Sequence, residues 1–287
     1  MKIKTLSLII LVITLAFKAD KPAYRIFNEK GKEVKYKELV TDAMKADIIL
    51  FGELHNNPIS HWLQLELTKD VYGEKQDHLI LGAEMFESDN ALILSEYVSK
   101  QIPKKNFERE ARLWPNYKTD YKPLVEFAHE KNIPFIATNI PRRYAAIVYK
   151  GGFEELEGLN DEAKALMAPL PINYDPELSC YKQMLEMGGM GAHVTENLPK
   201  AQAMKDATMA HFILKNWKQG DTFIHYNGSY HSDNFESIVW YLLEANPNLK
   251  IMTIATTQQP SIEELNEESV GVANFVICVP ESMTKTH

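Results

Sequence analysis

Six short apolar runs alternate with amphipathic stretches along this chain of 287 residues. Apolar runs bounded by turn residues are typical of buried β-strands, and the stretches between them have the spacing of amphipathic helices. The predicted strands cover residues 47–52, 79–85, 134–139, 222–227, 250–255 and 274–279. Because strands that alternate with helices generally pair in parallel, the sequence predicts an α/β fold, with a mostly parallel central sheet flanked by helices.

The helical pattern is not evenly distributed along the chain. A helix is expected over residues 58–72, with Asn57 as its N-cap, and Ser88 is expected to cap a second helix. Between residues 142 and 220 the sequence has helical patterns but no strand pattern. We therefore expect one α/β domain over residues 20–287, with a helical insertion or cap at about 142–220.

The N-terminal residues have the pattern of a secretory signal. Lys2 and Lys4 precede an apolar run over residues 6–17, which matches the charged and apolar regions of such a signal. The run is shorter than the roughly 20 residues that a membrane-spanning helix needs. No cysteine follows it that could carry a lipid. We expect residues 1–19 to be the signal segment of an exported protein that is periplasmic or membrane-associated and is not a lipoprotein.

Charge and cysteine content exclude two classes of protein. The formal net charge is −8, and the basic residues are scattered rather than gathered on one face, so nucleic acid is not an expected partner. Cys180 and Cys278 are the only cysteines, and Cys278 lies within a buried-strand pattern. We therefore expect two packed thiols rather than a scaffold built on disulfides.

One short motif occurs twice, each time directly after a predicted strand. Residues 52–55 read Gly-Glu-Leu-His, and residues 228–231 read Gly-Ser-Tyr-His. A glycine at a strand end lets the chain turn sharply, and ligands of open α/β sheets bind outside the carboxyl ends of the strands. Glu84 and Arg142 follow the same rule on two other strands. The sequence therefore predicts one site that contains Glu53, His55, Glu84, Arg142 and His231.

The residue types at this predicted site suit a metal ion. Imidazole and carboxylate groups bind zinc, manganese and cobalt ions, and a site with three protein ligands leaves room for water. His55, His231 and Glu84 are the predicted ligands. A metal ion lowers the pKa of bound water to about 7, which makes hydroxide available as a nucleophile.

The same residues also permit chemistry without a metal, or no chemistry at all. Glu53 or Glu84 could take a proton from water as a general base. Arg142 suits a carboxylate or a developing oxyanion, because its planar guanidinium group binds such groups through two nitrogens. In the structural alternative, His55 only caps the helix that follows it, and Glu84 is held by backbone amides.

Five sequence blocks resemble the ChaN-like haem-binding uptake proteins of the Tiki superfamily. The blocks are residues 51–58, 82–87, 137–142, 205–210 and 226–231. The superfamily is similar to TraB proteins and erythromycin esterases, in which paired Gly-x-x-His motifs with a glutamate carry hydrolytic chemistry that is often metal-dependent. By motif match, Glu53, His55, Glu84, Arg142 and His231 correspond to the shared pocket.

The resemblance implies an exported protein of haem or iron acquisition that binds haem at a subunit interface. We expect a homodimer whose partner in the cell is the outer-membrane uptake machinery. Tyrosinate, imidazole and thioether groups all ligate haem iron, and Tyr181 and His193 are the candidate ligands. The Met- and Gly-rich stretch 184–193 has no assigned role.

Two hypotheses about function remain open at this point. In the first, the chain is an exported protein that binds haem in iron uptake. In the second, it is a metal-dependent hydrolase of an ester or amide bond, with Glu53, Glu84 and Arg142 as its catalytic residues. The sequence leaves open whether the protein is an enzyme. A single chain could hold haem at its surface and retain a hydrolytic pocket.

Overall fold

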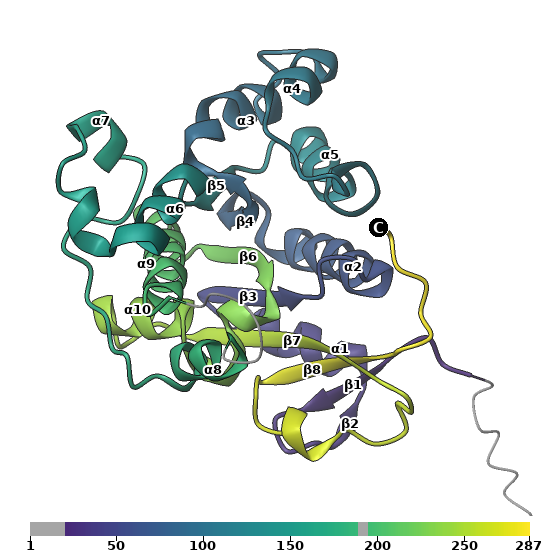
Figure 1. The fold of residues 1–287 in the computed structure, drawn as a ribbon. Helices are drawn as coiled ribbons and strands as arrows, with labels where there is room; N and C mark the ends of the chain where they lie inside the picture. The colour runs from purple at the N-terminus through teal and green to yellow at the C-terminus, as the bar shows by residue number, and fades with distance from the viewer. Residues whose placement is uncertain (1–20, 189–194) are drawn as a thin grey trace, which may run out of the picture.

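The computed structural model describes residues 21–188 and 195–287, whose strands form one eight-stranded sheet (Figure 1). The strand order is β2-β1-β8-β7-β3-β6-β4-β5. All pairs from β8 to β5 are parallel, and β1 is antiparallel to both of its neighbours. The strands are β1 (Arg25–Asn28), β2 (Glu33–Val34), β3 (Ile48–Glu53), β4 (Leu79–Glu87), β5 (Phe135–Asn139), β6 (Thr222–Gly228), β7 (Ile251–Gln259) and β8 (Phe275–Pro280).

The predicted mostly parallel α/β sheet is confirmed, and each of the six predicted strands is present within a few residues of its expected bounds. The sequence analysis missed β1 and β2. These strands have four and two residues, which is too short for a periodic pattern to stand out. They extend the sheet beyond β8 as an antiparallel edge.

Helices cover both faces of the sheet (Figure 1). The helices are α1 (Tyr36–Ala43), α2 (Pro58–Lys75), α3 (Ala91–Val98), α4 (Lys104–Glu110), α5 (Lys122–Lys131), α6 (Arg142–Gly151), α7 (Asp161–Lys164), α8 (Ser179–Gly188), α9 (Leu198–Asn216) and α10 (Ile238–Ala245). One hydrophobic core joins the sheet to α1, α2, α3 and α5. A second core joins the opposite face to α6, α9 and α10.

Strand β3 shows why the sequence has continuous apolar runs rather than alternating ones. Ile49 and Phe51 lie in the first core, whereas Ile48 and Leu50 lie in the second. Because successive side chains of a strand point to opposite faces, a strand covered on both sides must be apolar at every position. The apolar run ends where polar groups of the strand end begin, at Glu53.

Of the two predicted helix N-caps, Asn57 is confirmed and Ser88 is not. Asn57 caps α2 as expected, because its side chain accepts hydrogen bonds from the amides of Ile59 (3.0 Å) and Ser60 (3.1 Å). The expectation for Ser88 was wrong. Its hydroxyl donates to the carbonyl of Leu166, and a 3-10 turn separates it from α3.

The stretch between β5 and β6 is helical, as expected, and the described residues of 142–220 contain no strand. It includes α6, α7, α8 and α9. Helix α9 is more than a peripheral cap, because its buried face forms part of the second core together with residues of β3 and β6. This helix therefore belongs to the layer that covers the sheet.

The remaining sequence-based expectations concern the two cysteines, the N-terminal segment and His193. Cys180 and Cys278 are both buried and unpaired, which confirms the expectation of two packed thiols. The signal segment 1–19 and His193 lie outside the described residues. Among the described residues, no helix is both long and apolar enough to cross a membrane.

The pH dependence of stability tests the buried centre of β6. His225 is fully buried, with its ring nitrogens 2.7 Å from the Thr138 hydroxyl and 3.0 Å from Asn227 Oδ1. Burial lowers its pKa from 6.5 to about 4. Between pH 6.5 and pH 4, His225 is therefore protonated in the unfolded chain but neutral in the folded chain. The free energy of unfolding falls as the pH drops through this range.

We expect the wild-type chain to lose about 2 kcal/mol more than His225→Gln between pH 7 and pH 5. Urea unfolding at each pH measures the difference. His78→Gln, at a side chain that is 69% exposed, is the control. Equal slopes for His225→Gln and the wild type would mean that the folded protein protonates His225 freely.

Candidate functional site

The two Gly-x-x-His motifs lie side by side at the carboxyl end of the sheet. Strands β3 and β6 pair in parallel, and their register places Gly52 opposite Asn227 and Glu53 opposite Gly228. The chain approaches itself closely here. A Cβ atom on Gly52 would lie 2.7 Å from the Ile254 carbonyl oxygen, so no larger residue fits without movement of the backbone.

The first motif forms a buried hydrogen-bond network around Glu53. His55 Nδ1 lies 2.9 Å from Glu53 Oε1, and Gln64 Nε2 donates to Oε2 at 2.5 Å. The Tyr121 hydroxyl also donates to Glu53. Burial alone would raise the pKa of Glu53, but the charge of His61 and these hydrogen bonds outweigh it and lower the pKa. Glu53 is therefore an anion that orients His55.

The second motif forms a matching network around His231. Its Nδ1 lies 2.5 Å from Asp206 Oδ1 on α9, and its Nε2 lies 3.3 Å from Glu84 Oε1. All three side chains are buried. Burial alone would lower the pKa of His231, but Glu84 and Asp206 outweigh it and raise the pKa to about 10. The two neighbouring carboxyl groups therefore favour the protonated form of His231.

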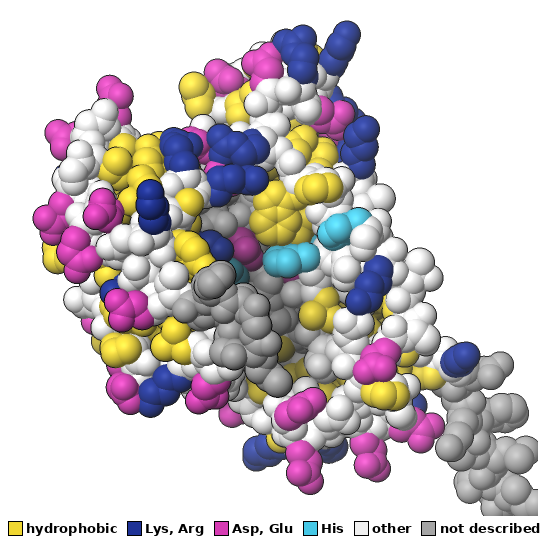
Figure 2. Space-filling view, viewed as in Figure 1, with side chains coloured by type: hydrophobic (Ala, Val, Ile, Leu, Met, Phe, Trp, Pro, Cys, Tyr) yellow, Lys and Arg dark blue, Asp and Glu magenta, His cyan; other side chains and the backbone are white. Residues whose placement is uncertain are grey.

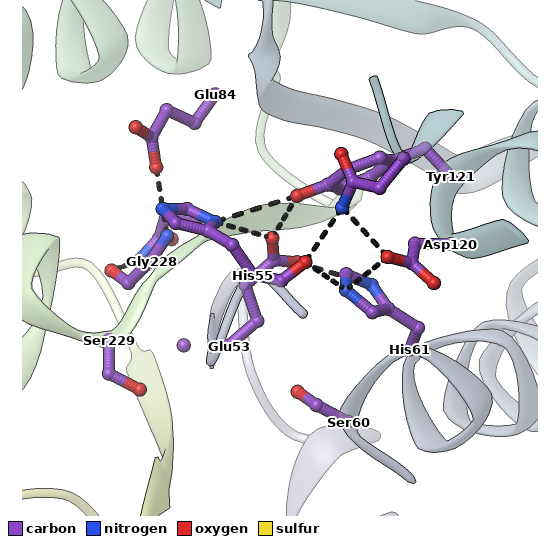
Figure 3. A network of polar contacts seen from close by, with 12 residues as sticks. Glu53, His55, Ser60, His61, Glu84, Asp120, Tyr121, Gly228 and Ser229 are labelled. Carbon is purple, nitrogen blue, oxygen red and sulfur yellow. Dashed lines mark hydrogen bonds and ion pairs between the residues drawn. The ribbon is translucent and has the colours of Figure 1, made fainter. Parts of the chain in front are cut away.

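Glu84 is the point where the two networks meet. Its Oε2 accepts a hydrogen bond from the Gly228 amide at 2.8 Å. A Cβ atom on Gly228 would lie 3.0 Å from His55 Nε2 and 3.6 Å from Glu84 Oε2, so the absence of a side chain lets the imidazole approach this carboxylate. Figure 3 shows the His55 ring between Glu53 and Glu84.

The two halves of the site therefore have the same design. Each histidine is held through Nδ1 by one buried carboxylate and turns Nε2 towards Glu84. Such pairing fixes the orientation and the tautomer of an imidazole. The halves differ in access, because the His55 side chain is 43% exposed and that of His231 only 6%. Each half therefore places an imidazole beside a carboxylate, which is an arrangement suited to proton transfer.

The structure thus brings Glu53, His55, Glu84 and His231 together. In the part of the chain that the structure describes, no group of three or more His, Cys, Asp or Glu side chains is arranged to hold a metal ion. The assignment of a metal to His55, His231 and Glu84 stays a prediction.

Arg142 lies at the start of α6, directly after β5, and its Nε donates to Glu87 at 2.5 Å. Arg112 also donates to Glu87, while Arg112 and Arg143 both bind Asp89. These three arginines and two carboxylates form what we call the arginine cluster. Figure 2 shows Lys and Arg side chains beside hydrophobic and histidine side chains around a hollow on this face.

Of the two candidate haem ligands, the structure describes Tyr181 but not His193. Tyr181 is fully buried, and its hydroxyl donates to Asp206 Oδ2 at 3.0 Å. Burial and the charge of Asp206 raise the pKa of its hydroxyl. Tyr181 is therefore linked to His231 through Asp206. His193 lies outside the described residues, and both ligand assignments stay predictions.

Sequence reasoning missed several residues that support the site. Asp206 is the one charged residue on the buried face of α9, and a charged residue at such a position is a recognisable signal. His61 on α2 is buried, and its Nε2 lies 3.1 Å from the His55 main-chain carbonyl. The other supporting residues are Gln64, Asn116, Asp120 and Tyr121. No local pattern distinguishes these four.

A model of the family "Haem-binding uptake, Tiki superfamily, ChaN" matches residues 39–242. The chain belongs to this family. The resemblance noted on sequence blocks is thereby confirmed. No curated protein matches the chain at a significant level.

A solved structure shares this fold. The chain is similar to ChaN of Campylobacter jejuni, reported with cofacial heme binding, with a TM-score of 0.66 and 16% identity over 88% of this chain and 96% of that one. A mutant of the erythromycin esterase EreC in its open conformation gives a TM-score of 0.47 and 12% identity, over 89% and 82% of the two chains. The type III effector HopBA1 gives 0.45 and 12%, over 84% and 91%.

Substituting the two motif glycines separates the fold from the site. In Gly52→Ala the new methyl group meets backbone atoms, so we expect a loss of about 1–3 kcal/mol in unfolding free energy. In Gly228→Ala the methyl group meets the half-exposed His55 ring, which can move away. We expect near wild-type stability but an altered His55 imidazole signal in NMR spectra.

The measurement combines urea unfolding with NMR of the imidazole protons. The His225 signal serves as the internal control, because that ring is fully buried and is absent from the contacts of the Gly228 position. An unchanged His55 signal in Gly228→Ala would contradict the close approach of the two motifs.

Proposed function

We propose that this chain is an exported haem-binding protein that acts in haem and iron uptake. The observation that carries the proposal is the family match, which spans residues 39–242 and includes both Gly-x-x-His motifs. The fold shared with ChaN of Campylobacter jejuni, whose structure is described as binding heme cofacially, supports it. Export rests on the signal pattern of residues 1–19.

The chemistry of the exposed face fits a haem. Haem combines an iron that takes nitrogen, oxygen or sulfur ligands with an apolar ring and two carboxylates. His55 has a half-exposed imidazole, and the Trp114 ring lies edge-on to it with a centroid distance of 5.0 Å. The arginine cluster supplies groups that bind carboxylates. Among the described residues, His55 and Trp114 would face the ring, and bound haem would supply an iron open to ligand exchange.

Partners follow from this proposal. A haem shared between two subunits would make the functional unit a homodimer, and delivery of haem would require contact with the uptake machinery of the outer membrane. Contact with the outer-membrane machinery would place the protein in the periplasm or at its membrane surface. Tyr181 and His193 remain the ligands proposed from the sequence. We add His55 to the proposal, because its imidazole is half-exposed.

A hemin titration of the chain from residue 20 onwards tests the proposal. We expect a saturable Soret band at a defined stoichiometry, whose position reports the axial ligand. His55→Ala should change that position if His55 ligates the iron, and Tyr181→Phe should change it if Tyr181 does. His78→Ala is the control, because this exposed histidine precedes β4 at the opposite end of the sheet. A titration without saturation would overturn haem binding.

A second candidate function is hydrolysis of an ester or amide bond. The buried series Asp206–His231–Glu84 favours it, because an imidazole between two carboxylates is a common arrangement for proton transfer in catalysis. In this proposal Glu53 or Glu84 is the base and Arg142 binds the oxyanion. The sequence adds a zinc, manganese or cobalt ion at His55, His231 and Glu84.

Metal analysis and esterase assays test the hydrolase. We expect one equivalent of a transition metal and a loss of about 100-fold or more in activity for His231→Ala, the typical scale for an acid–base group. His211→Ala, on the same helix as Asp206, is the control. Absence of bound metal together with full activity of His231→Ala would exclude this function.

A further inference from the structure

The arginine cluster carries more positive charge than its own carboxylates neutralise. It contains Arg112, Arg142 and Arg143 but only Glu87 and Asp89, so one positive charge is uncompensated. The arginine side chains are 41%, 64% and 47% exposed, in that order. The two carboxylates are much less exposed, at 6% and 15%. The excess charge therefore faces outwards.

Arg142 differs from the other two arginines in which of its guanidinium nitrogens form hydrogen bonds. Arg112 uses both terminal nitrogens on Glu87 and Asp89. Arg143 donates to Asp89, and its guanidinium lies 4.5 Å from the centroid of the Tyr144 ring. Arg142 binds Glu87 only through Nε and its backbone amide. Among the described residues, its two Nη atoms have no acceptor.

Glu87 acts as an anchor for Arg142. It is buried, and it accepts from the Arg142 backbone amide at 3.1 Å and from Nε at 2.5 Å. A guanidinium held on its Nε side presents the two Nη atoms as a pair, which is the geometry that binds a carboxylate through two hydrogen bonds.

The position of these arginines is unfavourable for helix stability alone. Arg142 and Arg143 occupy the first turn of α6, where the positive end of the helix dipole repels cations by roughly 0.3–1 kcal/mol each. Glu87 and Asp89 offset part of this repulsion. A structural ion pair would not need two arginines at this end of a helix, whereas a site for an anion benefits from both the arginines and the dipole.

The arginine cluster and the histidine site are both attached to strand β4. Glu84 and Glu87 lie three residues apart on β4, so about 10 Å of strand joins them. Asn139 connects them from β5, because its Nδ2 donates to the Glu84 carbonyl at 3.1 Å and its register partner is Glu87. The Asn139 Oδ1 atom is buried and has no hydrogen-bond partner among the described residues.

We infer that Arg142, anchored by Glu87 and supported by Arg112 and Arg143, binds a carboxylate of the ligand that occupies the histidine site. For haem this group is a propionate. The inference rests on the proposed haem-binding function and extends it, because it assigns the recognition of the carboxylate edge to residues of β4, α6 and the segment after α4.

The test compares hemin with iron protoporphyrin dimethyl ester, in which both propionates are blocked. We expect Arg142→Ala to weaken hemin binding by about tenfold or more, the scale of a charge-assisted hydrogen bond. Binding of the dimethyl ester should stay unchanged. Arg142→Lys should fall between the wild type and Arg142→Ala for hemin, because lysine keeps the charge but loses the paired geometry.

Control variants separate recognition from folding. Arg109→Ala removes an exposed arginine that pairs only with the adjacent Glu110, and should bind both porphyrins as the wild type does. Glu87→Gln should weaken hemin more than the ester, because Arg142 loses its anchor. Melting temperatures of all variants show whether α6 is intact.

Each outcome decides a different point. The carboxylate site is overturned, while haem binding stands, if Arg142→Ala weakens the binding of both porphyrins equally. It is also overturned if this variant weakens the binding of neither. A wild-type chain that binds neither porphyrin overturns haem binding, and the propionate site with it. Selective loss of hemin supports both.

Discussion

The parallel register between β3 and β6 is the constraint on which the site depends. It places Glu53 opposite Gly228, so that two sequence motifs 176 residues apart meet at one point of the sheet. A shift by one residue would turn every side chain of one strand to the other face and separate the motifs. The glycines permit the close approach, and the buried apolar residues of β3 on both faces hold the register in place.

Burial of charge is the second constraint, and it follows from the first. The carboxyl ends of β3 and β4 lie in the centre of a parallel sheet and are covered, so Glu53 and Glu84 are removed from water, and Asp206 on α9 is buried beside them. An isolated buried carboxylate is strongly unfavourable, whereas one with a cation and further hydrogen bonds is tolerated. His55, His61 and His231 supply these partners. The network of carboxylates and imidazoles therefore offsets the cost of burying these charges, and it also holds the histidines in one orientation.

The sequence was sufficient for the central strands because each is apolar along its whole length. It was also sufficient for the four residues at the strand ends, since the topology of a parallel sheet brings carboxyl ends together. It could not supply Asp206 or Tyr121. Asp206 reaches His231 across 25 residues and Tyr121 reaches Glu53 across 68. The charge of Asp206 on a buried helix face is a recognisable signal, but its partner is not, because these contacts depend on how α9 and the turn before α5 dock on the sheet. The Arg142–Glu87 pair, 55 residues apart, is missed for the same reason.

The gradient of exposure across the site separates what each half can bind. His55, Trp114 and the arginines lie at or near the surface, where a ligand as large as a porphyrin has access. His231 and Asp206 lie deeper and are in contact only with protein groups. A planar ligand with carboxylates therefore matches the outer half, and only a small group could reach the inner one. Glu84 belongs to both halves, so occupation of the outer half would change the charge that His231 experiences. In the two proposed functions, a ligand in the outer half and the protonation of His231 would therefore be linked through one carboxylate.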